Sequence, residues 1–179
     1  AGLIMTLLRG VLQTATLNES SPAKILQYVN KAMFTDLKRS NRFITLFHSR
    51  YDPQRKLLSF SNAAHNPPLI WQSSIQTVKR LDTLGMLIGL DIDTQYGEAE
   101  IELQSSDTII YYTDGFTDAA NRDGDRYDET NLVKDFQWAC LHCDNPQEIL
   151  NYLFEQVDQF VGNSNQIDQD MTLIVMQIK

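Results

Sequence analysis

An aspartate and a glycine follow the most strand-like run in the second half of the chain. Residues 107–112 are predicted to form a strand, because an unbroken series of bulky apolar and aromatic residues is typical of a strand covered on both faces. Asp114 and Gly115 come just after it. A carboxylate at the end of a rigid strand can bind a metal ion or act as an acid or base, and glycine lets a ligand approach the backbone. An ordinary Asp-Gly turn at a strand end is the alternative interpretation.

A second aspartate stands before a predicted strand near the C-terminus. Asp170 precedes the largely apolar residues 171–176, which again indicate a strand buried on both faces. If the two strands are antiparallel neighbours, the end of one lies beside the start of the other, so Asp114 and Asp170 share one sheet edge. Two carboxylates brought together there share a proton or bind a cation. Because no cysteine or histidine cluster is nearby, that cation would be magnesium or manganese.

Two helices are predicted at the start of the chain, before any of the predicted strands. Residues 2–17 carry apolar side chains at helical spacing, and the first helix is expected to be well buried. Ser21 and Pro22 are typical of a helix start, as a cap followed by proline at the first helical position. The short connection between the helices predicts antiparallel neighbours. The apolar faces comprise Ile4, Leu7, Leu8, Val11, Leu12 and Ala15, and Ile25, Leu26, Val29, Met33 and Leu37.

Strands dominate the middle of the chain. Residues 43–48 and 57–61 flank a turn signal at Asp52, which predicts a hairpin. His48 is interpreted as an ordinary strand residue. The stiff, polar loop 62–68 follows, and such loops often line sites, although surface loops have the same composition. Further strands are predicted at residues 69–71, 77–81 and 98–103.

Two more helices are predicted after the polar segment 121–128. The aspartates of that segment match a calcium loop only loosely, so it is interpreted as a solvated loop. Cys140 and Cys143 form a lone pair of cysteines without further zinc ligands, and they are interpreted as small apolar side chains on the buried face of a helix. The last helix is expected to begin after Asn145, which is followed by Pro146 and, three residues on, by Glu148.

Composition limits the classes of function. The chain has 179 residues, 42% hydrophobic and 21% charged, which suits one globular domain. Its formal net charge of −8 argues against nucleic acid and anionic membranes as partners, since both require a basic surface. No run has membrane-spanning length, and neither a membrane-spanning segment nor a secretory leader is expected. The two cysteines make no disulfide framework, which favours a cytoplasmic location.

Four stretches follow one another along the chain: SNAAHNPPL at residues 61–69, LGMLIGL at 84–90, YTDGFTDAAN at 112–121 and DMTL at 170–173. In this order they resemble the SpoIIE/RsbU group of metal-dependent protein phosphatases, the PPM family. Each stretch alone is weak evidence, whereas the ordered set is strong evidence, and the similarity covers essentially the whole chain. The resemblance implies an α+β fold, a four-layer α/β/β/α sandwich of two antiparallel sheets flanked by helices.

The resemblance also assigns roles to individual residues. Asp114 matches the metal-binding aspartate of the family, and Asp170 its terminal one, so both are expected to be catalytic metal ligands. The implied cofactor is a two-metal centre of Mn²⁺ or Mg²⁺. His65, Asn66 and Gly115 match positions that face the substrate.

The chain departs from the family pattern in two places. The family has two adjacent acids where this sequence reads Gln169-Asp170, with Asp168 one step earlier, so the identity of the terminal ligand stays open among these residues. The family also has strands and a G-D-x-x-G-x-G turn, carrying a bridging aspartate, before its first helix. Here a helix is already under way at Gly2, so residues 1–179 are interpreted as one domain that is incomplete at its N-terminus and a poor catalyst by itself.

The predicted function is hydrolysis of phosphoserine or phosphothreonine on a regulatory protein, an anti-sigma-factor antagonist of a bacterial partner-switching pathway. An upstream sensor or receiver domain is expected, and a homodimer is compatible with the prediction. Neither binding to nucleic acid nor insertion into a membrane is expected. A catalytically inactive phosphatase-like binding module is the alternative, favoured by Gln169 and by the missing turn. A haloacid-dehalogenase-type phosphatase is a third interpretation, but its nucleophilic aspartate would fall at Tyr112.

Overall fold

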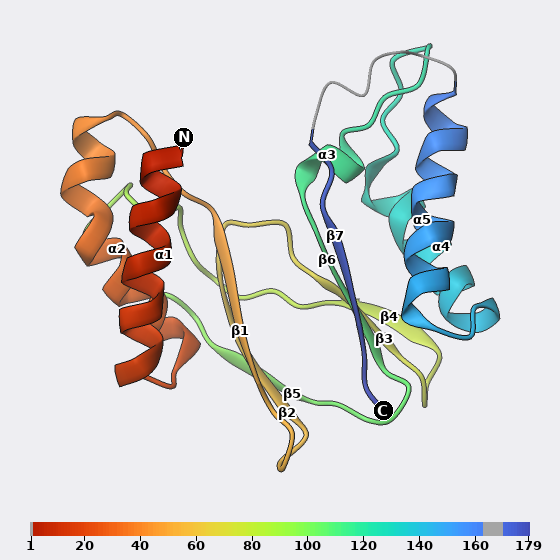
Figure 1. Ribbon diagram of the computed structural model, residues 1–179, viewed down its shortest axis with the longest axis horizontal. Coiled ribbons are helices and arrows are strands. Elements are labelled where there is room, and N and C mark those ends of the chain that lie inside the picture. The colour runs from red at the N-terminus through yellow and green to blue at the C-terminus, as the bar shows by residue number, and fades with distance from the viewer. Residues whose placement is uncertain (1, 163–169) are drawn as a thin grey trace. The chain divides into compact units, whose positions relative to one another are not determined.

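A computed structural model of the chain describes residues 2–162 and 170–179. The chain forms two compact units. The first consists of Ala1–Pro67 and Asp82–Glu102, and the second of Pro68–Leu81 and Leu103–Lys179. Each unit contains one antiparallel sheet and a pair of long helices (Figure 1), which confirms the predicted α+β arrangement of two antiparallel sheets flanked by helices.

Helices α1 (Gly2–Asn18) and α2 (Pro22–Arg39) open the first unit and lie side by side (Figure 1). The start of α2 is the predicted one. Ser21 has an extended backbone, its side chain accepts a hydrogen bond from the amide of Lys24, and Pro22 stands at the first helical position.

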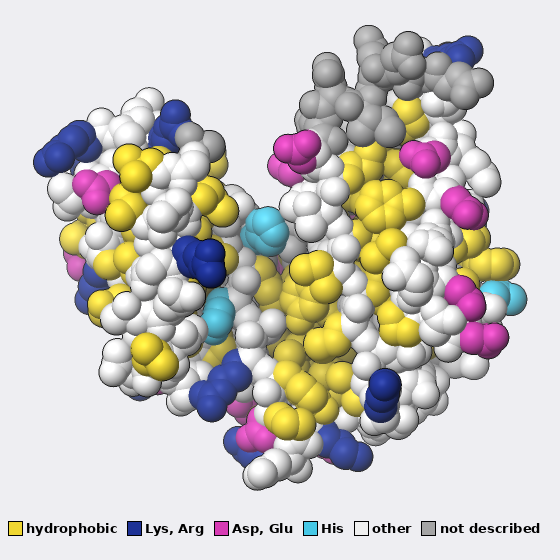
Figure 2. Space-filling model, viewed as in Figure 1, with side chains coloured by type: hydrophobic (Ala, Val, Ile, Leu, Met, Phe, Trp, Pro, Cys, Tyr) yellow, Lys and Arg dark blue, Asp and Glu magenta, His cyan; other side chains and the backbone are white. Residues whose placement is uncertain are grey.

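The prediction that α1 is well buried is wrong. Leu8 and Ala15 are buried against α2, but Leu3, Met5 and Leu7 are 77%, 60% and 43% exposed. Apolar side chains accordingly reach the surface over this helix (Figure 2). A wide apolar face shows only which residues are able to be buried. In the described part of the chain, the residues of α1 that are buried are those packed against α2.

The first sheet has the strand order β1 (Leu46–Asp52), β2 (Leu57–Ala63) and β5 (Ala99–Glu102), all antiparallel. The predicted hairpin is therefore confirmed. Its turn forms because Oδ1 of Asp52 accepts hydrogen bonds from the amides of Gln54 at 2.9 Å and Arg55 at 3.1 Å.

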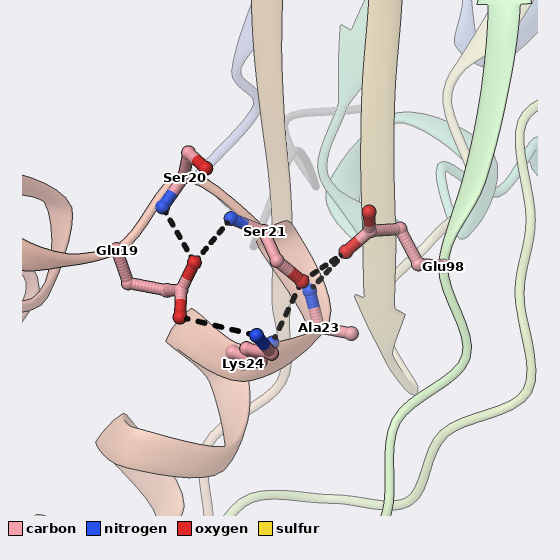
Figure 3. A network of polar contacts seen from close by, with 6 residues as sticks. All are labelled: Glu19, Ser20, Ser21, Ala23, Lys24 and Glu98. Carbon is pink, nitrogen blue, oxygen red and sulfur yellow. Dashed lines mark hydrogen bonds and ion pairs between the residues drawn. The ribbon is translucent and has the colours of Figure 1, made fainter.

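A carboxylate from the segment before β5 fastens the helix pair to this sheet (Figure 3). Oε2 of Glu98 accepts hydrogen bonds from the Ser21 hydroxyl and from the Ala23 amide at 3.0 Å. Glu19 closes the connection between the helices by accepting from the amides of Ser20 and Ser21. In the first turn of α2, the Ala23 amide thus donates to Glu98 and the Lys24 amide to the Ser21 side chain.

The second sheet has the strand order β4 (Thr77–Arg80), β3 (Leu69–Gln72), β6 (Thr108–Tyr112) and β7 (Leu173–Gln177), again antiparallel. Helices α4 (Asp128–His142) and α5 (Pro146–Val161) cover one of its faces (Figure 1). The core between helices and sheet includes Leu69, Ile110, Leu132, Phe136, Leu153 and Val157. None of the described helices is both long and apolar enough to cross a membrane.

Strand β7 differs from its prediction. Leu173 is buried against the helices, but its neighbour Ile174 is 57% exposed. The expectation of burial on both faces is therefore wrong. Alternate residues of a strand point to opposite faces, and the helix pair covers only one face of this edge strand.

Of the two cysteines, Cys140 lies in α4 and Cys143 just after it, so the prediction of two buried helical side chains holds only in part, whereas the polar loop is largely exposed, as predicted. Cys140 and Cys143 are half-buried against the helix–sheet core, and burial raises the pKa of the Cys140 thiol to about 12. In the loop, Oδ1 of Asn121 accepts from the amides of Asp123 and Asp125. Within the described residues no group of three or more potential metal-ligating side chains is present.

A buried carboxylate ties the far end of the second sheet together. Asp107 is 1% exposed and accepts hydrogen bonds from the amide of Ser73 at 2.8 Å, its hydroxyl at 3.1 Å and the amide of Gln104 at 2.9 Å. These bonds join the β3–β4 turn to the segment that enters β6.

We expect Asp107→Ala to lower the free energy of unfolding by about 3 kcal/mol, because it leaves the Ser73 and Gln104 amides without their charged acceptor. Urea unfolding measures this value. The matched control is Asp144→Ala at an exposed position of the same unit, which should change stability by less than about 0.5 kcal/mol. Equal effects of the two substitutions would mean that the Asp107 bonds contribute nothing specific.

Candidate active site

The pairing of β6 with β7 brings the two predicted carboxylates to one edge of the second sheet. The strands are antiparallel, with Ile110 opposite Val175 and Tyr112 opposite Leu173. Asp114 therefore follows the end of β6 beside the point where Asp170 leads into β7. The strand pairing on which the sequence prediction depended is confirmed, and acidic side chains are visible at this end of the unit near α3 (Figure 2).

Hydrogen bonds continue past the last residues of the two strands. The amide of Thr113 donates to the carbonyl of Thr172 at 3.1 Å. The amide of Thr172 donates to the Thr113 hydroxyl at 3.0 Å, and this hydroxyl lies 3.5 Å from the carbonyl oxygen of Asp170. The segments that carry Asp114 and Asp170 are thus joined through Thr113.

Asp114 begins the single-turn helix α3 (Asp114–Thr117). The amide of Gly115 donates to Oδ1 of Asp114 at 3.0 Å, which orients the carboxylate. Phe116 is fully buried and makes edge-to-face contacts with Tyr127 and Phe154, at centroid distances of 6.2 and 5.4 Å. The turn is therefore anchored in the helix–sheet core while the Asp114 carboxylate remains exposed.

Asp114 and Asp170 suit a hard divalent cation. Both are exposed carboxylates, and magnesium and manganese prefer such oxygen ligands. The residues described at this edge supply two of these ligands, and bound water commonly completes such a shell. Asp168 and Gln169 lie outside the described residues, so the choice of the terminal ligand stays a prediction.

His65 and Asn66 belong to the first unit, whereas Asp114, Gly115 and Asp170 lie together in the second. The loop of His65 is held by the buried Asn62, whose side chain accepts from the His65 amide and donates to its carbonyl, both at 2.9 Å. Nδ1 of His65 lies 3.0 Å from the Thr45 hydroxyl. The histidine is thus presented by a rigid loop, and its role toward a substrate stays a prediction.

An ionic network that no sequence pattern predicted lies at the same end of the sheet as Asp114. Nε of Arg80 lies 3.3 Å from Oε1 of Glu129, and the hydroxyl of Tyr112 donates to Oε2 of Glu129 at 3.5 Å. Burial and then the charge of Glu129 raise the pKa of Tyr112. Arg80 pairs opposite Leu69, at the same end of the sheet as Asp114. No local sequence signal connects these residues, because they come from three separate elements.

Asp118 is the next acidic residue after Asp114 along the chain. In the structure its Oδ1 lies 2.8 Å from Nη1 of Arg126. The backbone bridge between Ala120 and Arg126 folds the intervening loop onto itself. The charge of Asp118 is therefore engaged in holding this loop.

Comparison with known proteins identifies relatives over the full length of the chain. The model of the family described as "Stage II sporulation protein E (SpoIIE)" matches residues 1–179. The phosphoserine phosphatase RsbU of Bacillus subtilis is 23% identical over 181 residues, covering 100% of this chain and 52% of RsbU. The chain therefore spans about half the length of this relative.

Solved structures share the fold. The SiaA-PP2C domain of Pseudomonas aeruginosa superimposes with a TM-score of 0.81 at 20% identity, covering 99% of this chain and 70% of that one. The RsbU and RsbW domains of Rv1364c from Mycobacterium tuberculosis give 0.74 at 18% identity, covering 98% and 47%. The manganese-presoaked phosphatase domain of SpoIIE from Bacillus subtilis gives 0.62 at 20% identity, covering 99% and 74%.

Proposed function

This chain belongs to the SpoIIE family, and on that premise we propose that it works as the phosphatase domain of a metal-dependent protein serine/threonine phosphatase. Its fold is that of PP2C-type phosphatase domains. The observation that carries the proposal is the β6–β7 pairing, which sets Asp114 and Asp170 at one sheet edge with their main chains joined through Thr113.

In the proposed reaction the chain's own residues hold and orient the metal centre. Asp114 and Asp170 supply carboxylate oxygens, and the Gly115 amide fixes one oxygen of Asp114 so that the other can face a cation. Bound Mn²⁺ or Mg²⁺ supplies a water of lowered pKa and neutralises charge on the phosphoryl oxygens. The buried ring of Phe116 limits movement of the Asp114 turn, which preserves the arrangement between turnovers.

We assign substrate-facing roles to His65, Asn66 and Gly115. Asn62 braces the His65 backbone on both sides, so that the imidazole and the neighbouring Asn66 amide are offered from a loop of fixed shape. Imidazole and amide groups can donate hydrogen bonds to phosphoryl oxygens or to the substrate backbone.

The substrate that fits best is a phosphorylated regulatory protein, in particular an anti-sigma-factor antagonist. RsbU is named a phosphoserine phosphatase, and the Mycobacterium tuberculosis neighbour joins RsbU and RsbW domains. The net charge of −8 is compatible with a protein substrate. If the unsubstituted intact protein binds the phosphoprotein but does not hydrolyse it, that result would instead support the alternative of an inactive binding module.

Asp114→Asn should reduce manganese-dependent dephosphorylation of a phosphoserine protein by at least about a hundredfold, because a neutral amide weakens both metal affinity and water activation. The rate is measured in the intact protein at saturating manganese. Asp123→Asn, at an exposed position of the neighbouring loop, is the matched control and should retain full activity. Near-normal turnover of Asp114→Asn would remove this residue from the centre.

Asp170→Asn should weaken manganese binding more than Asp168→Asn does. The main chain of Asp170 is next to the Thr113 contact that fixes this segment beside Asp114, which favours Asp170 as the ligand. Calorimetric titration of both variants with manganese measures the difference. Small and equal losses would show that the terminal motif supplies no ligand.

A further inference from the structure

We infer that Thr113 is a positioning residue, whose hydroxyl holds the Asp170 segment in register with Asp114. This inference rests on the proposed function, since it assigns the contact a role in shaping that metal site. Thr113 itself touches neither a substrate nor a cation in this account.

The backbone of Thr113 leaves the strand and starts α3. Its φ of −95° and ψ of 160° are extended, and its carbonyl accepts a hydrogen bond from the amide of Phe116 at 3.0 Å. This carbonyl therefore belongs to the first turn of α3. A threonine before a helix usually accepts from a first-turn amide with its hydroxyl, but Thr113 makes no such side-chain cap.

The hydroxyl is used across the sheet edge instead. In a regular antiparallel ladder, a hydrogen-bonded pair of residues exchanges two N–H···O=C bonds. Between Thr113 and Thr172 one of them is present, from the Thr113 amide to the Thr172 carbonyl at 3.1 Å. In the second bond, the Thr172 amide donates to the Thr113 hydroxyl at 3.0 Å. The hydroxyl takes the place of the Thr113 carbonyl, which already accepts from the Phe116 amide.

The Thr113 hydroxyl also contacts the main chain of Asp170, the second proposed metal ligand. It lies 3.5 Å from the carbonyl of Asp170, to which its proton can be donated. The hydroxyl thus contacts both ends of the short segment 170–172, so that β6 can turn into α3 at Asp114 without releasing the segment that carries Asp170. Without the hydroxyl, one backbone bond would hold this segment, and the Asp170 carboxylate would sample more positions.

Hydrogen exchange tests the contact directly. Thr113→Val removes the hydroxyl at nearly constant volume, and the Thr172 amide should then exchange about fivefold faster, the effect expected for one lost hydrogen bond. Thr113→Ser keeps the hydroxyl and should retain slow exchange. Amides inside the β6–β7 ladder should stay protected in all variants. Loss of protection along the entire ladder in Thr113→Val would overturn the inference, because the hydroxyl would then be supporting the fold as a whole.

Manganese titration by calorimetry tests the consequence. Thr113→Val should bind manganese about fivefold more weakly, while Thr113→Ser should match the unsubstituted protein. The control is Thr77→Val at the opposite end of the same sheet, where an exposed threonine hydroxyl donates to the carbonyl of Ile75 at 3.1 Å. This variant makes the same chemical change and should leave affinity unaltered.

The outcomes separate this inference from the proposed function. Unchanged affinity of Thr113→Val, or an equal loss in Thr113→Ser, would contradict the positioning role while leaving the metal site intact. An unsubstituted protein that binds no manganese would contradict the proposed metal site, and with it the purpose assigned to the contact. Faster Thr172 exchange together with weaker binding in Thr113→Val alone is the result that the inference requires.

Discussion

The antiparallel pairing of β6 with β7 is the interaction on which the candidate site depends. One acidic residue follows β6 and another precedes β7, and only an antiparallel arrangement places the two at the same sheet edge. The register also matters, because Tyr112 pairs with Leu173 and leaves Thr113 opposite Thr172. A slip by one residue would exchange the faces of β7 and expose Leu173 in place of Ile174.

Packing on one face of the sheet maintains that register. Ile110 and Leu173 lie against the core formed with α4 and α5, and Phe116 extends this core beneath the turn that carries Asp114. At the opposite end, the buried Asp107 closes the entry to β6. Strand β6 is thus fixed at both ends. The exposed carboxylate of Asp114, which follows the strand, can therefore be held in place without being buried.

Much of this architecture was predictable from local patterns. The starts of α2 at Pro22 and of α5 at Pro146 follow from capping chemistry, which depends on adjacent residues. The convergence of Asp114 and Asp170 needed one assumption about strand pairing. The errors concern α1 and β7, since apolar content indicates a capacity for burial and not the presence of a covering neighbour. Ile174 shows this at an edge strand.

The contacts that position the site were not predictable in the same way. Thr113 reads as an ordinary cap, and its use as a substitute strand acceptor depends on where α3 turns. The network of Arg80, Glu129 and Tyr112 likewise depends on three elements meeting at one end of the sheet. Such contacts follow from tertiary structure, which the sequence expresses only through the complete fold.

A crystal structure of the manganese-loaded protein tests the central claim most directly. We expect a manganese ion in direct coordination with carboxylate oxygens of both Asp114 and Asp170, with the Thr113 hydroxyl bonded to the amide of Thr172 beside it. Manganese bound at another place, or to only one of these two carboxylates, would contradict the claim that the β6–β7 pairing builds the metal site.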